Sequence, residues 1–173
     1  MKSVLISIQP KWCELIASGK KTIEVRKTLP KVKEPFKVYI YCTNWKDNIY
    51  WKNHYKDKLG KVIGEFVCEV VTVALSGHYW ILPKSKTLID ELDLLDYADG
   101  KTVYGWHISD LVIYDKPREL SEFKHKCNGV CVDTKKMFKC ERFIEEGFKC
   151  NGLNPITRPP QSWCYVESEV EGE

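Results

Sequence analysis

The segment Gly19-Lys20-Lys21-Thr22-Ile23-Glu24-Val25-Arg26 joins a predicted helix to a predicted strand. Gly19 suits the end of a helix, because glycine adopts the left-handed conformation that stops one. Ile23 and Val25 then alternate with polar residues, which predicts a strand with one buried face. Strict alternation would place Lys21 on the apolar face. We therefore expect Lys21 to belong to the turn that precedes the strand.

The outward face of this strand carries a carboxylate and a guanidinium two residues apart, at Glu24 and Arg26. Arg26 can bind a phosphate or a base edge through two donors. Glu24 can accept a hydrogen bond from an exocyclic amine, or orient Arg26. The simpler explanation is an exposed salt bridge, worth at most about 1 kcal/mol. The residue types alone favour that simpler explanation.

Further along the chain, alternating and Val-rich segments predict mostly strands. Val4, Ile6 and Ile8 share one face of the first, which predicts a half-buried strand. Glycines predict a bend near Gly64 and an interruption near Gly105. The pattern lacks regular strand–helix–strand alternation, so it favours a small mixed α+β barrel. The expected strands are residues 3–8, 22–26, 36–42, 61–74, 102–114 and 162–167.

Two helices are expected among these strands. Pro10 suits the start of the first, which ends at Gly19. Thr87 can cap a second helix over residues 88–98, which Gly100 ends. Residues 44–60 predict a long loop or an irregular helical segment. The expected buried stripes are Trp12, Leu15 and Ile16 in the first helix, and Leu88, Leu92 and Leu95 in the second.

The composition, with 43% hydrophobic and 29% charged residues over 173 positions, is that of one globular domain and argues against disorder. The apolar runs are too short to cross a bilayer, and the first residues lack the features of a signal peptide. We therefore expect a single cytoplasmic domain over residues 1–173, with no membrane partner.

Positive charge is concentrated in the first third of the chain. Residues 1–60 hold 13 Lys and Arg against 5 Asp and Glu, whereas residues 61–115 hold 4 against 9. A basic face of this kind suits phosphate binding, since clustered cations release counterions when they bind nucleic acid. The alternative is a solvated surface whose charges are mixed again by folding.

The segment described first resembles the signature GxKxxExR of ASCH domains, which Gly19, Lys21, Glu24 and Arg26 match at every fixed position. Residues 105–111, 116–120 and 158–166 also look like segments of prophage-type members. The resemblance implies a PUA-like fold, in which a bent sheet closes into a pseudo-barrel with two or more helices at its mouth. It further implies RNA or modified-nucleotide binding in a basic cleft lined by Lys21, Glu24 and Arg26.

The resemblance leaves enzymatic activity open. Some small members are amidohydrolases that remove an acyl group from acylated cytidine, with a Thr nucleophile at the position of Glu24 and a Lys at position 21. Glu24 has no hydroxyl, and the reach of nearby Thr22 to Lys21 is unknown, so we favour binding without turnover. A ribonuclease is the other hydrolase considered, with Lys21 binding phosphate and Glu24 or His107 acting as base. If the chain is an enzyme, the candidate catalytic residues are Lys21 and Glu24.

Aromatic side chains interleaved with lysines favour a binding role, since bases stack on such rings. Trp45 is the first choice for stacking, whereas Tyr39 and Tyr41 could equally pack the core. His107 follows a Trp in a strand, where histidines are more often packed than catalytic. The candidate nucleic-acid-binding residues are Lys20, Lys21, Thr22, Glu24, Arg26, Trp45 and His107.

Residues 125–152 form a predicted Cys-rich insertion that can build little core of its own. Its four cysteines suggest a structural Zn²⁺ site, although neither pair has the strong CxxC spacing. Free thiols, or disulfides formed after purification, are the alternatives, and no cofactor is required for binding. A protein-binding adaptor that uses this insertion is a third functional class. The candidate metal ligands are Cys127, Cys131, Cys140 and Cys150, whereas Cys13, Cys42, Cys68 and Cys164 suit the core.

Overall fold

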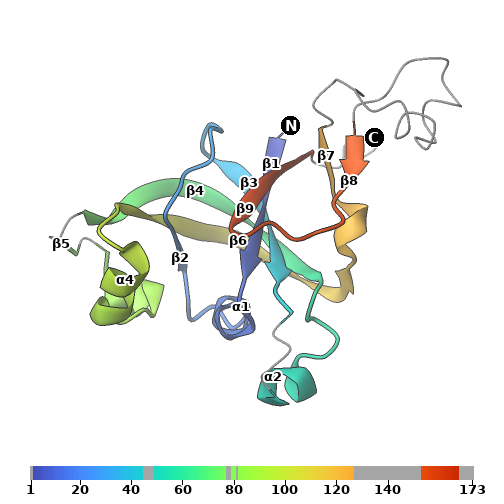
Figure 1. The fold of residues 1–173 in the computed structure, drawn as a ribbon, viewed down its shortest axis with the longest axis horizontal. Helices are drawn as coiled ribbons and strands as arrows, with labels where there is room; N and C mark the ends of the chain where they lie inside the picture. The colour runs from blue at the N-terminus through green and yellow to red at the C-terminus, as the bar shows by residue number, and fades with distance from the viewer. Residues whose placement is uncertain (1, 45–48, 77–78, 81, 127–152, 168–173) are drawn as a thin grey trace, which may run out of the picture.

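The computed structural model describes residues 2–44, 49–76, 79–80, 82–126 and 153–167 of the chain (Figure 1). These residues form a mixed α+β structure with one large sheet and one small sheet. The large sheet contains β1 (Lys2–Ile8), β2 (Ile23–Arg26), β3 (Phe36–Cys42), β4 (Val62–Ser76), β5 (Tyr79–Trp80), β6 (Val103–Arg118) and β9 (Trp163–Glu167). The small sheet pairs β7 (Lys124–Lys126) with β8 (Leu153–Pro155). The helices are α1 (Pro10–Ala17), α2 (Ile49–His54), α3 (Lys84–Thr87), α4 (Glu91–Ala98) and the 3-10 turn η1 (Leu120–Glu122).

The large sheet is strongly curved but not closed. Its order is β2-β6-β4-β3-β1-β9, with β5 added to β4, so within the described chain β2 and β9 are two unpaired edges. Only β1 and β3 run parallel. Side chains bridge the gap near the two edges, where Trp163 Nε1 donates to Thr28 Oγ1 at 2.9 Å. The predicted closed pseudo-barrel is therefore wrong, because β2 pairs only with β6 and its edge is never joined to β9 by a backbone ladder.

The sheet is packed on both faces, which corrects the prediction that the first strand is half-buried. Val4, Ile6 and Ile8 lie in one apolar cluster, as predicted. Leu5, on the opposite face of β1, is fully buried in a second cluster together with Phe123. β1 is buried on both faces because η1 and the chain that follows it cover the second face.

Two glycines mark where strands approach each other closely. Between Val62 and Gly64, where the sequence predicts a bend, the ladder of β4 against β6 changes register. A Cβ at Gly64 would lie 2.3 Å from the carbonyl oxygen of Val112. The predicted interruption at Gly105 is wrong, because β6 runs through it in register with Val25 of β2. Glycine is needed there because the side chain of Leu82 occupies the space of a Cβ.

The second helix begins later than predicted. Leu88 adopts a positive φ of 55°, which ends α3, so a helix cannot run continuously from residue 88. α4 instead starts after Asp90, and the shifted start moves the buried face to Leu94 and Ala98. Leu92, predicted to be buried, is 79% exposed. In the described parts of the chain, no helix has both the length and the apolar character needed to span a bilayer.

Candidate functional site

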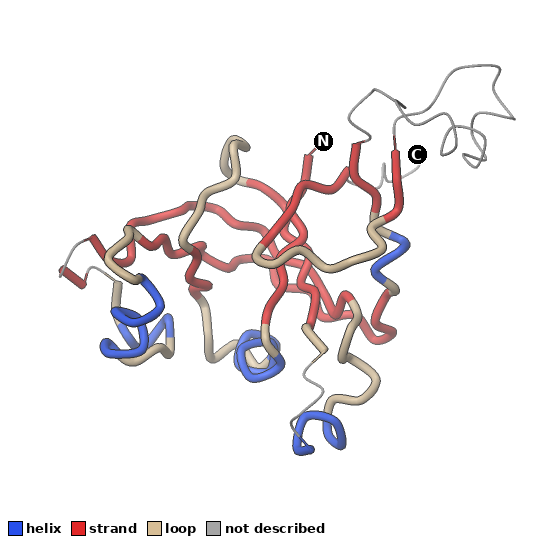
Figure 2. The backbone as a smooth tube through the Cα atoms, viewed as in Figure 1, coloured by secondary structure: helices blue, strands red, loops and turns tan. Residues whose placement is uncertain are grey.

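A cavity of about 740 Å³ opens beside β2, near the gap between the two sheet edges. Its walls come from the end of β1, the start of α1, β2, α4 and residues 159–161 before β9. Figure 2 shows α1 and α4 on either side of the segment that leads into β2. Segments from both ends of the chain therefore meet at this cavity.

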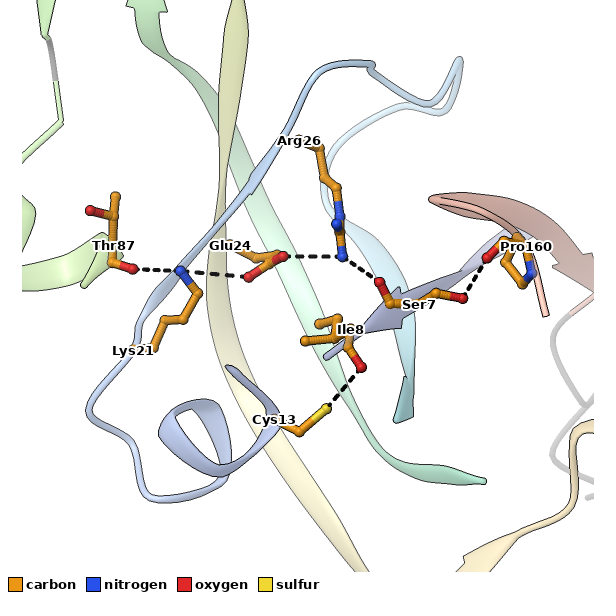
Figure 3. A network of polar contacts seen from close by, with 8 residues as sticks. All are labelled: Ser7, Ile8, Cys13, Lys21, Glu24, Arg26, Thr87 and Pro160. Carbon is orange, nitrogen blue, oxygen red and sulfur yellow. Dashed lines mark hydrogen bonds and ion pairs between the residues drawn. The ribbon is translucent and has the colours of Figure 1, made fainter. Parts of the chain in front are cut away.

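Lys21, Glu24 and Arg26 form a continuous row of charges along one wall of this cavity (Figure 3). Lys21 Nζ lies 3.6 Å from Glu24 Oε2, and Arg26 Nη2 lies 3.1 Å from Glu24 Oε1. The three side chains are 1%, 6% and 12% exposed. The row is therefore buried, and the exposed salt bridge considered from the sequence does not describe it.

The turn after α1 fixes the position of Lys21. Gly19 has a φ of +71°, and the backbone N–H of Lys21 donates to the carbonyl of Leu15. Lys21 precedes the first residue of β2, so the prediction that it belongs to the turn is confirmed. Its ammonium donates to the carbonyl oxygen of Thr87 in α3 and lies 4.8 Å from the centre of the Trp12 ring.

Arg26 links β2 to the end of β1. Its Nη2 donates to the carbonyl oxygen of Ser7 at 2.7 Å, and Ser7 Oγ donates to the carbonyl of Pro160 at 2.7 Å. Arg26 Nε is buried and has no hydrogen-bond partner among the residues that the structure describes. A buried donor without a partner is energetically costly, so this nitrogen is a local exception to the rule that buried polar groups are hydrogen-bonded.

The burial of this row perturbs its proton equilibria. Burial lowers the pKa of the Lys21 ammonium, Glu24 opposes that change, and the positive charge of Arg26 adds to it. Buried ion clusters are weak stabilisers, and replacing them with apolar residues is often neutral or favourable. Titratable groups perturbed in this way within a cavity are candidates for a functional site.

The lining of the cavity is not basic in itself. Its charged side chains are Lys21, Glu24, Arg26, Asp93 and Asp96, so carboxylates outnumber cations by three to two. Lysines instead lie against two aromatic residues of the lining. The Lys11 ammonium lies 4.7 Å from the centre of the Trp12 ring, and that of Lys27 lies 4.9 Å from the Tyr97 ring.

Several residues predicted from the sequence do not line this cavity. Lys20 and Thr22 are exposed on the turn, and neither reaches the lining. His107 pairs with Ile23 across the ladder, and its Nε2 hydrogen-bonds with Thr72 Oγ1 at 2.9 Å. Burial lowers the pKa of His107, and nearby Lys86 adds to this effect.

The aromatic residues considered as stacking candidates do not line this cavity in the described structure either. Tyr39 and Tyr41 are buried in the second apolar cluster, so they pack the core. Trp45 lies outside the described residues. Sequence reasoning missed the aromatic lining of Trp12 and Tyr97, because Trp12 was assigned to the buried stripe of the first helix.

The cysteines proposed as metal ligands, Cys127, Cys131, Cys140 and Cys150, lie outside the described residues. The described parts of the chain contain no cluster of three His, Cys, Asp or Glu side chains that could hold a metal ion. Cys13, Cys42 and Cys68 are buried in the first apolar cluster, as predicted. Cys164 packs against the second cluster.

Comparison with known proteins adds a family and a fold. Residues 6–157 match the family described as the ASCH domain. The crystal structure of ASCH from Zymomonas mobilis is similar at a TM-score of 0.60 and 20% identity, covering 96% of this chain and 89% of that one. A Tyr→Phe variant of the same protein gives 0.59 and 20%, covering 96% and 91%. At such identities the likeness concerns the fold, and no curated protein matches the sequence.

Proposed function

The chain belongs to the ASCH domain family, whose PUA-like fold is associated with RNA binding, and on that premise we propose that it binds RNA or a modified nucleotide in the cavity beside β2. The observation that carries this proposal is the buried row of Lys21, Glu24 and Arg26, whose three residues all line the cavity. A buried charge cluster of this kind, with a perturbed pKa and beside a cavity, is a candidate ligand-binding site.

The size and walls of the cavity suit one nucleobase with its sugar. Its volume of about 740 Å³ falls within the range of small-ligand sites. Trp12 and Tyr97 are the aromatic residues of its lining, and a base would pack against them. The carboxylate of Glu24 keeps lone pairs beyond those facing Lys21 and Arg26, so it can accept from an exocyclic amine.

Phosphate groups would lie outside the acidic lining. Lys11 and Lys27, which stand against the aromatic walls, can pair with phosphates while a base enters between them. The proposed site therefore differs from the basic cleft expected from the sequence. Its interior carries both positive and negative side chains, and further lysines lie beside its aromatic residues. Lys20 and Thr22 stay candidates for outer contacts only, and His107 is left out of the proposed site.

Equilibrium binding of single-stranded RNA tests the proposal. We expect 12-nucleotide homopolymers of cytidine, adenosine or uridine to bind with an affinity that falls as salt rises. Arg26→Ala should weaken the best of them by at least tenfold. Lys116→Ala removes an exposed cation that does not line this cavity, and it should change affinity by less than twofold. Equal effects of the two changes would overturn the proposal.

A hydrolase acting in the same cavity is the second candidate, because Lys21 and Glu24, which lie 3.6 Å apart, both line the cavity, and burial lowers the pKa of Lys21. Glu24, at the centre of the row, offers a carboxylate but no hydroxyl nucleophile. Incubation with RNA or an acylated cytidine, followed by chromatography, distinguishes the two functions. Product that disappears in Lys21→Ala would favour the hydrolase, whereas bound and unchanged ligand favours the binding domain.

Four further predictions concern the whole chain: a single domain over residues 1–173, a Cys-rich insertion at 125–152, prophage-type relatives and a cytoplasmic location. Zinc in the insertion is tested by metal analysis of protein purified without added zinc, with Cys131→Ser as the control. An adaptor would lose its protein partner on deletion of residues 125–152 and would ignore changes at Lys21 or Arg26.

A further inference from the structure

A second cavity of about 600 Å³ adjoins the first, and Pro160 lines both. Its charged and aromatic lining comes from three strands and the segment before β9. Figure 1 shows β7 beside β9, near the amino-terminal end of β1. Its charged and aromatic side chains are Lys2, His125, Lys126, Arg158, Tyr165 and Glu167.

The charge of this second cavity is the opposite of that of the first. In the described part of its lining, three permanent cations, Lys2, Lys126 and Arg158, face a single carboxylate, Glu167. Lys126 Nζ lies 3.8 Å from that carboxylate, so one cation is partly neutralised. Neither Lys2 nor Arg158 has an ion-pair partner within the described part of the chain. Among the described residues, two exposed cations therefore remain for a ligand.

The segment 156–162, which contains Pro160 and forms the wall between the two cavities, is held by hydrogen bonds at both ends. The backbone N–H of Ile156 donates to the carbonyl of Phe123, and the backbone N–H of Ser7 donates to the carbonyl of Ser162. Ser7 Oγ also holds the carbonyl of Pro160, while the carbonyl of Ser7 accepts from Arg26. The position of the shared wall is thus coupled directly to the charged row of the first cavity.

We propose that the second cavity binds the sugar-phosphate backbone of a single RNA strand whose base occupies the first cavity, an inference that rests on the proposed function. Lys2 and Arg158 pair with phosphates on the far side of Pro160. The ring of Tyr165, with Lys2 Nζ 5.5 Å from its centre, packs against a neighbouring sugar or base. The ligand is therefore an oligonucleotide, not a free nucleoside.

The division of charge favours a single strand over a protein or membrane partner. A base with donor groups suits the acidic first cavity, and consecutive phosphates suit the basic second one. A flexible RNA strand carries a base and phosphates at adjoining positions. It can bend over the wall at Pro160 so that each group enters the cavity that suits its charge.

The double variant Lys2→Ala/Arg158→Ala tests this inference, since both side chains are exposed and neither contributes to an apolar cluster. Binding of a 12-nucleotide cytidine homopolymer and of cytidine 5′-monophosphate is measured at several salt concentrations. We expect the oligomer to bind roughly tenfold more weakly, with the slope of log affinity against log salt smaller by about 1.4, as for two lost phosphate contacts. Binding of the mononucleotide should change by less than twofold.

Lys101→Ala/Lys116→Ala is the matched control, because it removes the same charge from two exposed positions that line neither cavity. An equal loss of oligomer affinity in the two double variants would overturn this inference. It would not contradict the proposal that a nucleotide binds in the first cavity. Failure of the proposed function looks different: Arg26→Ala would then leave mononucleotide binding unchanged. Equal weakening of mononucleotide and oligomer in Lys2→Ala/Arg158→Ala would also overturn the inference.

Discussion

Arg26 on β2 donates a hydrogen bond to the carbonyl oxygen of Ser7 on β1, although three strands separate β2 from β1 in the sheet. The contact exists because the sheet curls until its first and fifth strands face each other. A backbone ladder would have filled this space. A side-chain contact across an open gap leaves room for the cavity beside it, so the incomplete closure of the sheet and the candidate site have one physical cause.

The effects of substitutions at Glu24 and Arg26 on the free energy of unfolding should depend strongly on each other. Removing one partner of a buried ion pair leaves the other charge uncompensated and typically costs about 3 kcal/mol. We therefore expect Glu24→Gln and Arg26→Met each to lower the free energy of unfolding by roughly that amount. The double variant should lose less than the sum, with a coupling of about 1–3 kcal/mol. Urea unfolding of the four proteins measures the cycle. Additivity within about 0.5 kcal/mol would show that the two residues do not depend on each other.

Glu24 should also set the choice of base. Cytidine and adenosine carry an exocyclic amine that a carboxylate can accept from, whereas uridine presents a carbonyl at the same place. A well-made contact of this kind is worth about 1–3 kcal/mol, so we expect cytidine or adenosine homopolymers to bind at least about fivefold more tightly than uridine. Glu24→Gln should reduce that preference to less than twofold, because an amide can rotate to donate to uridine.

Competition between labelled cytidine and unlabelled uridine homopolymers on one protein sample measures this preference without knowledge of the active concentration. Asp99→Asn is a suitable control, since it neutralises an exposed carboxylate that follows α4 and does not line the cavity. A preference for uridine in the unaltered protein would contradict the role assigned to Glu24.

The sequence predicted the local part of the site well, because that part is contiguous. Gly19 sets the turn, and the spacing of Lys21, Glu24 and Arg26 places three charges along a single wall. The partners of these residues were not predictable. Lys21 reaches a carbonyl 66 positions away, and Ser7 one 153 positions away. Such contacts depend on how the whole sheet curls, and no local pattern encodes that.

The errors at the level of the fold have a similar origin. Alternation identifies the apolar residues of a strand but cannot tell whether the second face will be covered, which is why β1 seemed half-buried. The helix after Thr87 was displaced because Leu88 adopts a left-handed conformation, which an apolar residue rarely does. Closure of the sheet depends on whether two distant edges meet, and β2 has only four residues with which to meet β9.

Lys21 should make stability depend on pH in the alkaline range. Burial lowers the pKa of Lys21 in the folded protein, so between that value and about 10.4 the unfolded chain binds more protons than the folded one. The free energy of unfolding must therefore rise with pH across this window. In Lys21→Met the titrating amine is gone. We expect the stability of the unaltered protein relative to Lys21→Met to increase from about pH 7 to about pH 10.

Urea unfolding at several pH values measures this difference, in which contributions from groups that do not interact with Lys21 cancel. Lys20→Met removes the exposed lysine one position earlier and controls for the change in net charge. A difference between the unaltered protein and Lys21→Met that stays flat with pH, or falls, would contradict the assigned effect of burial.

The two tightly packed glycines should respond differently to alanine. At Gly64 the new Cβ would lie 2.3 Å from a backbone oxygen of Val112, so two strands must separate to admit it. At Gly105 the nearest atoms are side-chain methyls, Leu82 Cδ1 at 2.2 Å and Ile23 Cγ2 at 2.8 Å, which can shift more easily than a backbone oxygen. We expect Gly64→Ala to cost about 3 kcal/mol or to prevent folding, and Gly105→Ala to cost about 1–2 kcal/mol. Thermal unfolding followed by circular dichroism ranks the two. Equal melting temperatures for the two variants would contradict this prediction, because they would mean that moving the backbone costs no more than moving a side chain.

Gly105→Ala should also affect RNA binding. Since Gly105 pairs with Val25, between Glu24 and Arg26, we expect Gly105→Ala to weaken RNA binding more than its loss of stability explains.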